Sequence, residues 1–80
     1  MSYIICFWDK SKIQVSDEVG EKLKVIRAEG IIKTFELGPG QYSIRGVDKI
    51  IPKADAFDVF PSEWEYLKSL EDRSNFKQLT

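Results

Sequence analysis

Residues 3–8 form an unbroken apolar run of aromatic, β-branched and other apolar side chains. A strand with one solvent-facing side alternates apolar and polar residues, whereas a strand covered on both faces is continuously apolar. The run therefore predicts a strand near the middle of a sheet. Polar residues 9–12 follow, and residues 13–15 alternate as in a half-buried strand, which predicts that the first two strands form a hairpin.

A helix is predicted after Ser16, which is a favourable N-cap residue. Val19, Leu23 and Ile26 follow at helical spacing and share one face of that helix. Gly30 lies where a helix commonly ends in a left-handed residue. This amphipathic segment is the strongest helix signal in the chain.

Three further strands are predicted beyond the helix, at residues 31–37, 41–45 and 49–51. The last ends at Pro52, and because proline cannot donate to a ladder it is expected to be an edge strand. The expected fold class is α+β, with the element order β-β-α-β-β-(β)-α. We expect a mostly antiparallel sheet of four to five strands with one helix packed on it.

The C-terminal third is predicted to be helical and acidic. Residues 53–60 are predicted to form a connector. Ser62 and Glu65 then match the capping box that opens a helix. We expect this C-terminal helix to span residues 61–73, with a frayed tail at 74–80. Residues 1–80 then form a single domain, with a β-β-α-β-β core at 3–52.

Residue types restrict the chemistry, since the chain has no histidine and one cysteine, Cys6. General acid–base catalysis at neutral pH commonly uses histidine, and zinc sites use Cys and His ligands. We therefore expect no enzyme activity, no catalytic residue, no metal and no cofactor. Cys6 lies in the apolar run and is predicted to be a buried thiol. A single cysteine, which cannot form a disulfide within the chain, is typical of a protein of the reducing cytoplasm. That run is also too short to span a membrane, which takes about 20 residues.

Acidic and aromatic residues are concentrated near the C-terminus. Residues 54–80 contain three Lys or Arg against six Asp or Glu, a net charge of −3. Aromatic anchors beside carboxylates are typical of protein-binding surfaces, where the rings supply contact area and the charges steer association. The predicted protein-binding residues are Tyr66, Glu63, Trp64 and Asp58.

Side-chain directions on the predicted C-terminal helix separate the aromatic residues into two groups. Trp64 and Tyr66 are two positions apart, about 200° around a helix, and cannot both be buried on one face. Trp64 is expected to pack onto the domain, and Tyr66 to point outward with Glu63 nearby. Phe57 and Phe60 are expected to close the core of this small domain.

A second hypothesis is nucleic-acid binding through a cationic strand face. Lys33, Arg45, Lys49 and Lys53 lie on or beside the later strands, and aromatic residues nearby could stack with bases. The overall charge of −1 argues against it, because nucleic-acid binders usually carry a basic excess. A homodimer through the exposed edge of the last strand is a further alternative.

The strand run 3–8, the helix through Gly30 and the strands up to Pro52 together resemble small, mostly uncharacterised bacteriophage or mobile-element proteins. The resemblance covers residues 3–52 and implies a strand–strand–helix–strand–strand plan. It also implies a protein that binds a host or phage component, as an inhibitor or accessory factor, in the cytoplasm of a host cell. It carries no catalytic residue. The tail after residue 53 has no counterpart in it.

Overall fold

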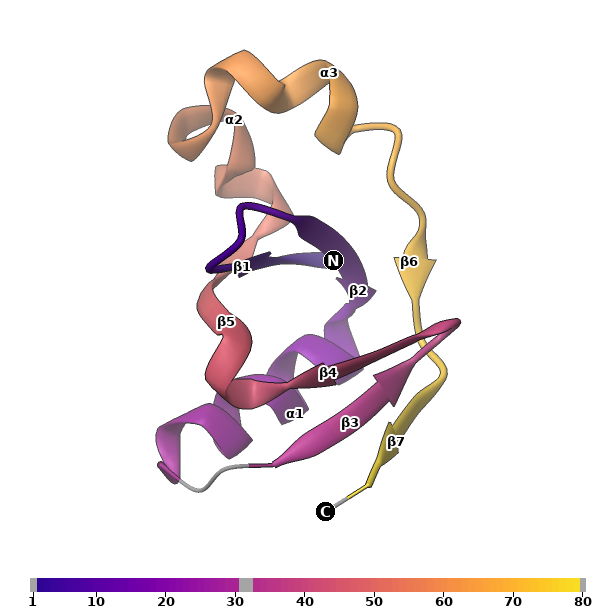
Figure 1. Ribbon diagram of the computed structural model, residues 1–80. Helices are drawn as coiled ribbons and strands as arrows, with labels where there is room; N and C mark the ends of the chain where they lie inside the picture. The colour runs from indigo at the N-terminus through magenta and orange to yellow at the C-terminus, as the bar shows by residue number, and fades with distance from the viewer. Residues whose placement is uncertain (1, 31–32, 80) are drawn as a thin grey trace.

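The computed structural model describes residues 2–30 and 33–79 and confirms the α+β class. Its central feature is β1 (Ser2–Phe7), which pairs antiparallel with β2 (Lys12–Ser16) on one side and β5 (Val47–Pro52) on the other. The strand β6 (Asp72–Arg73) adds in parallel to β2, which gives a four-stranded sheet in the order β5-β1-β2-β6 (Figure 1). The predicted hairpin, the central first strand and the edge position of the strand that ends at Pro52 are confirmed.

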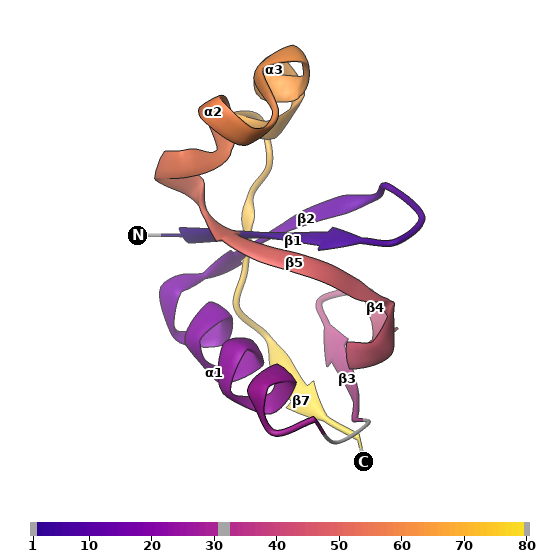
Figure 2. The ribbon, with the colours of Figure 1, turned by 90° about the vertical axis from the view of Figure 1, so that its left-hand side faces the viewer.

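The two faces of β1 build two separate cores, which explains why its sequence is apolar throughout. Tyr3, Ile5 and Phe7 point into the larger core, while Ile4 and Cys6 point into the smaller one. Figure 2 shows β1, β2 and β5 of this sheet edge-on, with helices α2 and α3 on one side and α1 with β3, β4 and β7 on the other. The sheet is therefore the middle of three layers.

The helix α1 (Asp17–Ala28) covers one face of this sheet. Ser16 caps it as predicted, its Oγ accepting a hydrogen bond from the Val19 N–H at 3.3 Å. Gly30 has the expected positive φ, 73°. Gly20 sits in mid-helix because a Cβ there would overlap the Tyr3 ring. Glycine at this position lowers the intrinsic helix propensity of α1, but it allows close packing on β1.

A second sheet completes this layer. It consists of β4 (Gly40–Ser43), β3 (Thr34–Leu37) and β7 (Phe76–Gln78), in that order. The predicted third strand began at residue 31, and residues 31–32 lie outside the described part of the chain. The expectation of one sheet of four to five strands is therefore wrong in its connectivity, because the strands are divided between two sheets.

The strands are divided between two sheets because of a turn that the sequence pattern did not predict. The strand predicted at 41–45 ends at Ser43, and η1 (Ile44–Gly46), a 3₁₀ turn, redirects the chain into β5. Ser43 Oγ accepts a hydrogen bond from the Arg45 N–H at 3.3 Å, which stabilises the turn. Ile44 is buried, but it lies in this turn rather than in the predicted strand.

Residues 53–67 form the third layer, here called the helical cap. It runs through η2 (Lys53–Asp55), α2 (Ala56–Val59), η3 (Pro61–Glu63) and α3 (Trp64–Leu67). Both α-helices are one turn long, so the single helix expected over 61–73 is wrong. The predicted capping box is not formed either, since the N-cap of α3 is Glu63 and makes no side-chain capping hydrogen bond.

The segment after Arg73 was expected to fray, but within the described residues it forms β7. Phe76 is the reason, since its ring lies 5.7 Å from that of the fully buried Phe35. The Leu79 N–H donates to the Thr34 carbonyl at 2.8 Å and extends the pairing with β3. The tail is thus a structural part of the domain.

Candidate protein-binding surface

The helical cap packs on the sheet through a small core of its own. Ala56 and Leu67 are buried against Ile4 and Cys6 of β1. Phe60 and Trp64 are partly buried against the same cluster. The expectations that Trp64 packs onto the domain and that Phe60 helps to close a core are confirmed.

The cap also exposes apolar side chains to solvent. Tyr66 is 55% exposed, which confirms that it points outward, and Phe57 is 52% and Val59 43% exposed. The expectation that Phe57 closes the core is wrong. Because α2 buries Ala56, the neighbouring Phe57 is turned to the side of the helix, where its ring meets Trp64 edge to face at 5.7 Å. We use the name outer face for the exposed apolar residues of the cap together with its exposed carboxylates: Asp55, Phe57, Asp58, Val59, Glu65 and Tyr66.

Phe57 and Val59 were not among the predicted site residues. A helix of a single turn gives too few positions for a periodicity to show which side chain points outward. The signal available was the density of aromatic residues at 57–66, which exceeds what a small core can cover. It identifies the segment but not the individual contact residues.

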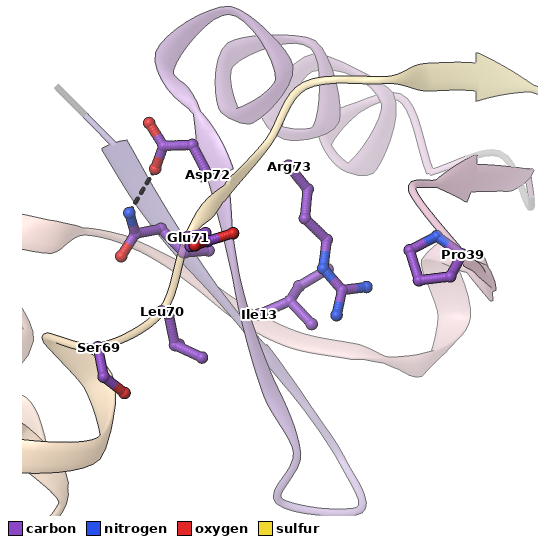
Figure 3. Close-up of a pocket in the computed structure, with 8 residues that line it drawn as sticks. Ile13, Pro39, Ser69, Leu70, Glu71, Asp72 and Arg73 are labelled. Atoms are coloured by element: carbon purple, nitrogen blue, oxygen red, sulfur yellow. Dashed lines mark hydrogen bonds between the residues drawn. The ribbon is translucent and has the colours of Figure 1, made fainter.

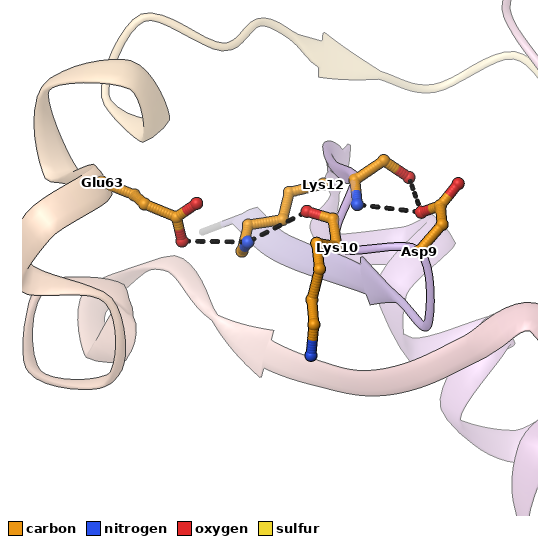
Figure 4. A network of polar contacts seen from close by, with 5 residues as sticks. Asp9, Lys10, Lys12 and Glu63 are labelled. Atoms are coloured by element: carbon orange, nitrogen blue, oxygen red, sulfur yellow. Dashed lines mark hydrogen bonds and ion pairs between the residues drawn. The ribbon is translucent and has the colours of Figure 1, made fainter.

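Glu63 does not lie beside Tyr66 as a free carboxylate. Its Oε2 pairs at 2.9 Å with the Nζ of Lys12, a residue only 8% exposed (Figure 4). The same ammonium donates to the Lys10 carbonyl at 3.2 Å and lies 4.5 Å from the centre of the Phe60 ring. Glu63 therefore fastens the cap to β2 from the inside.

Three carboxylates remain on the outer face. Glu65 pairs with Lys68 at 2.8 Å, and both side chains are largely exposed. Asp55 and Asp58 lie in exposed positions on either side of Phe57 in the sequence. Within residues 2–30 and 33–79, neither aspartate forms an ion pair. The outer face thus combines an exposed aromatic ring with unpaired negative charge.

The four cations of the nucleic-acid hypothesis are not brought onto one face. Lys33 and Arg45 lie near each other at the second sheet, where the Ile44 N–H donates to the Lys33 carbonyl at 2.9 Å. Lys49 is paired with Cys6 in the other sheet, and its Nζ lies on the cap side, 5.8 Å from the Phe60 ring. Lys53 begins the cap itself. These positions do not make a continuous cationic stripe.

The edge of β5, considered for a homodimer, carries two protective features. Pro52 lies at one end of the strand and has no N–H to offer. At the other end, the Arg27 guanidinium of α1 donates to the Asp48 carbonyl. Proline and blocking side chains are devices by which edge strands avoid pairing with a second chain. The structure therefore disfavours dimerisation at this edge.

A cleft of about 350 Å³ lies beside β2, where the chain leaves α3 and approaches the strand (Figure 3). Its wall includes Asp72, which accepts hydrogen bonds from Gln14 Nε2 and from Ser2 Oγ. The Gln14 bond, supported by that of Ser2, lowers the pKa of the Asp72 carboxyl. Arg73 extends across the cleft, and its Nη1 donates to the Tyr42 hydroxyl at 2.8 Å. The bonds of Asp72 link β6 to β1 and β2, and the bond of Arg73 links β6 to β4 of the second sheet.

Few side chains remain as candidates for catalysis or metal binding in the described part of the chain. Burial raises the pKa of the Cys6 thiol, despite the nearby Lys12 and Lys49, so the thiol is held in its unreactive protonated form. In the described part of the chain, no group of His, Cys, Asp and Glu side chains is arranged to hold a metal ion. Likewise, none of the described helices is long and apolar enough to cross a membrane.

Comparison of the chain with protein-family models, with curated proteins and with solved structures finds no match.

Proposed function

We propose that this chain is a non-enzymatic binding protein that contacts a partner protein through the outer face of the helical cap. One observation carries the proposal: three large apolar side chains, Phe57, Val59 and Tyr66, are exposed on two helices of one turn each. Exposed aromatic residues grouped with charged ones are characteristic of interaction sites, and tyrosine is enriched among interface hot spots. The cap is the part of the surface that best fits this description.

The role of an inhibitor or accessory factor, of phage or mobile-element type, belongs to the same proposal. Such a protein acts by occupying a surface of its partner and needs no catalytic group of its own. We place this binding in the cytoplasm, of a host cell if the chain is phage-encoded. The single Cys6 thiol, buried and without a disulfide partner in the chain, supports a reducing compartment.

The experiment compares two aromatic substitutions on α3. Tyr66→Ala should leave the melting temperature nearly unchanged, because the side chain is largely exposed, and should weaken partner binding by about tenfold or more. Trp64→Ala should lower the free energy of unfolding by roughly 2 kcal/mol, because it removes a partly buried ring from the cap core. Thermal unfolding gives the stabilities, and affinity capture from a host lysate with mass spectrometry identifies the partner whose binding is then measured.

Val25→Ala is the matched control, since Val25 is exposed on α1, on the other side of the sheet. It should change neither stability nor partner binding appreciably. The proposal fails if Tyr66→Ala and Phe57→Ala both bind the captured partner as well as the natural protein does. It also fails if Val25→Ala weakens binding as much as they do.

A further inference from the structure

After the helical cap, the chain crosses the edges of both sheets. Residues 71–79, here called the strap, contain β6 at the edge of the four-stranded sheet and β7 at the edge of the second sheet (Figure 1). None of these residues is buried, and only Arg73 and Phe76 are partly buried. In β1, by contrast, five of the six residues are buried. The strap therefore contributes little to either hydrophobic core beyond the Phe76 ring.

Polar contacts attach β6 to the rest of the domain. Asp72 accepts hydrogen bonds from the Ser2 hydroxyl and the Gln14 amide. Arg73 Nη1 donates to the Tyr42 hydroxyl at 2.8 Å. When such a bond breaks, water replaces the protein partner, so the net contribution of each bond to attachment is small.

Two cavities border the strap. β6 lies beside the cleft of about 350 Å³ described above (Figure 3). A second cavity, of about 470 Å³, is lined by α1 and β7, with Val25 and Ile26 on the helix and Phe76 on the strand. Protein interiors are close-packed, and side chains beside a cavity lack part of those contacts. The strap is therefore loosely packed at both of its strands.

A buried acceptor at β6 also opposes attachment. Gln14 is 6% exposed and lies opposite Asp72 in the parallel pairing of β2 with β6. Its Nε2 donates to Asp72, but its Oε1 is buried and has no hydrogen-bond partner among the described residues. A buried polar atom without a partner is unfavourable because it has lost its bonds to water. Detachment of β6 releases this amide, and Oε1 can then bond to water.

We infer that the strap detaches reversibly as a unit while the rest of the domain stays folded. Local opening of this kind is typical of segments with few buried apolar contacts and exposed hydrogen bonds. The two strands move together because only residues 74 and 75 separate them. Detachment uncovers the edges of β2 and β3, whose backbone groups can then pair with another strand. This conformational change does not depend on the proposed function of the cap.

Hydrogen exchange of backbone amides, followed by NMR at a series of urea concentrations, tests the inference. The Leu79 N–H donates to the Thr34 carbonyl at 2.8 Å, and the Gly38 N–H donates to the Asn75 carbonyl at 3.3 Å. These two strap amides report on attachment, whereas the amides of β1 report on the whole domain. The strap amides should share one protection factor, at least about tenfold below that of the β1 amides. Their exchange should also depend less on urea, because detachment exposes less surface than unfolding does.

Ile5→Val separates detachment from global unfolding. Ile5 is fully buried in β1 and stays buried when the strap detaches. The variant should therefore lower the protection of the β1 amides severalfold and leave that of the strap amides unchanged.

Arg73→Ala tests whether β6 and β7 open together. It removes the bond from β6 to Tyr42, and should lower the protection of both strap amides by the same factor although they report on β7. Arg27→Ala is the matched control, because it also removes a guanidinium donor, in this case to the Asp48 carbonyl, but from α1. It should leave the strap amides unchanged.

Three results would overturn the inference. If Ile5→Val lowers the protection of the strap amides as much as that of β1, they exchange only through global unfolding. If Leu79 is much less protected than Gly38 in the natural sequence, the segment frays instead of detaching as a unit. If Arg73→Ala changes neither strap amide, or only one, the two strands open independently. Because Ile5→Val leaves the strap intact, its result decides even if Arg73→Ala does not fold.

Discussion

Asp72 joins distant parts of the chain through its side chain. Its carboxylate accepts hydrogen bonds from Ser2 Oγ, at 2.7 and 2.9 Å, and from the buried Gln14 on β2. These bonds favour the ionised form and lower the pKa of Asp72, while the loss of some hydration around the carboxylate opposes them. The carboxylate therefore contributes more to the folded state when ionised than when protonated.

The pH dependence of stability follows from that lowered pKa. A carboxyl whose pKa is lower in the folded state stabilises the protein above its unfolded pKa of about 3.9, and the contribution is lost as the pH falls through the folded value. Asp72→Asn should therefore reduce the loss of stability between neutral pH and acid. Urea unfolding at a series of pH values measures this, with Asp58→Asn, on the outer face of the cap, as the control. An unchanged pH profile in Asp72→Asn would show that the hydrogen bonds of Asp72 contribute no net stability.

At the scale of residues, burial could be predicted from the sequence where the spacing of apolar residues within one element determines which side chains are buried. Val19, Leu23 and Ile26 are buried as their helical spacing required. Lys12 belongs to the polar stretch 9–12 of the sequence, yet it is buried in β2. Its burial depends on a cap formed by residues some 50 positions later, and no local pattern contains that information. The predicted Trp64 and Tyr66 directions were confirmed, because they depend only on the angle between two residues of one helix.

At the scale of elements, the short strands β6 and β7 are defined by what they pair with. β6 has two residues and lies parallel to β2 beside Gln14 and Val15, while β7 has three and pairs with β3. In β7, Phe76 supplies the contact with the core and Lys77 is exposed. The strand therefore depends on Phe76 for most of its burial.

Substitutions in β7 test whether the tail is structural. Phe76→Ala should lower the free energy of unfolding by roughly 2 kcal/mol, less than for a fully buried phenylalanine because the ring is only partly buried. Lys77→Ala, one position along the strand, should change it by less than about 0.5 kcal/mol. Chemical denaturation measures both. Equal, negligible effects would mean that residues after Arg73 are as loosely held as the sequence indicated.

The elements that the sequence predicted well are those with strong local signals. The hairpin, the capped helix α1 and the edge position of the strand ending at Pro52 all have such signals, and all are confirmed. The C-terminal helix was predicted too long because Ser62 and Glu65 match a capping box that the structure does not form. Strands of two or three mixed residues, such as β6, have no local signal. They are specified by the edge on which they pair.

At the scale of the whole molecule, the central sheet separates two surfaces of different character. The cap lies on one side with its net charge of −3, and α1 with the second sheet lies on the other (Figure 2). The molecule is elongated, 34 × 21 × 21 Å, and the cap lies at one end of it (Figure 1). Among the described residues, the four cations of the nucleic-acid hypothesis are divided between these two sides of the sheet.

The dispersion of these cations should prevent nucleic-acid binding. Affinity for nucleic acid increases with the number of phosphates that a protein neutralises at once, and falls steeply with salt for the same reason. Lys33 and Arg45 lie at one sheet, whereas Lys49 and Lys53 lie near the acidic cap, so one strand of nucleic acid cannot contact all four without approaching carboxylates. We expect no measurable binding of a labelled single-stranded oligonucleotide at physiological salt, by fluorescence anisotropy. Salt-sensitive binding at micromolar concentration, lost in Arg45→Glu with Lys49→Glu, would establish the nucleic-acid hypothesis over the protein-binding one.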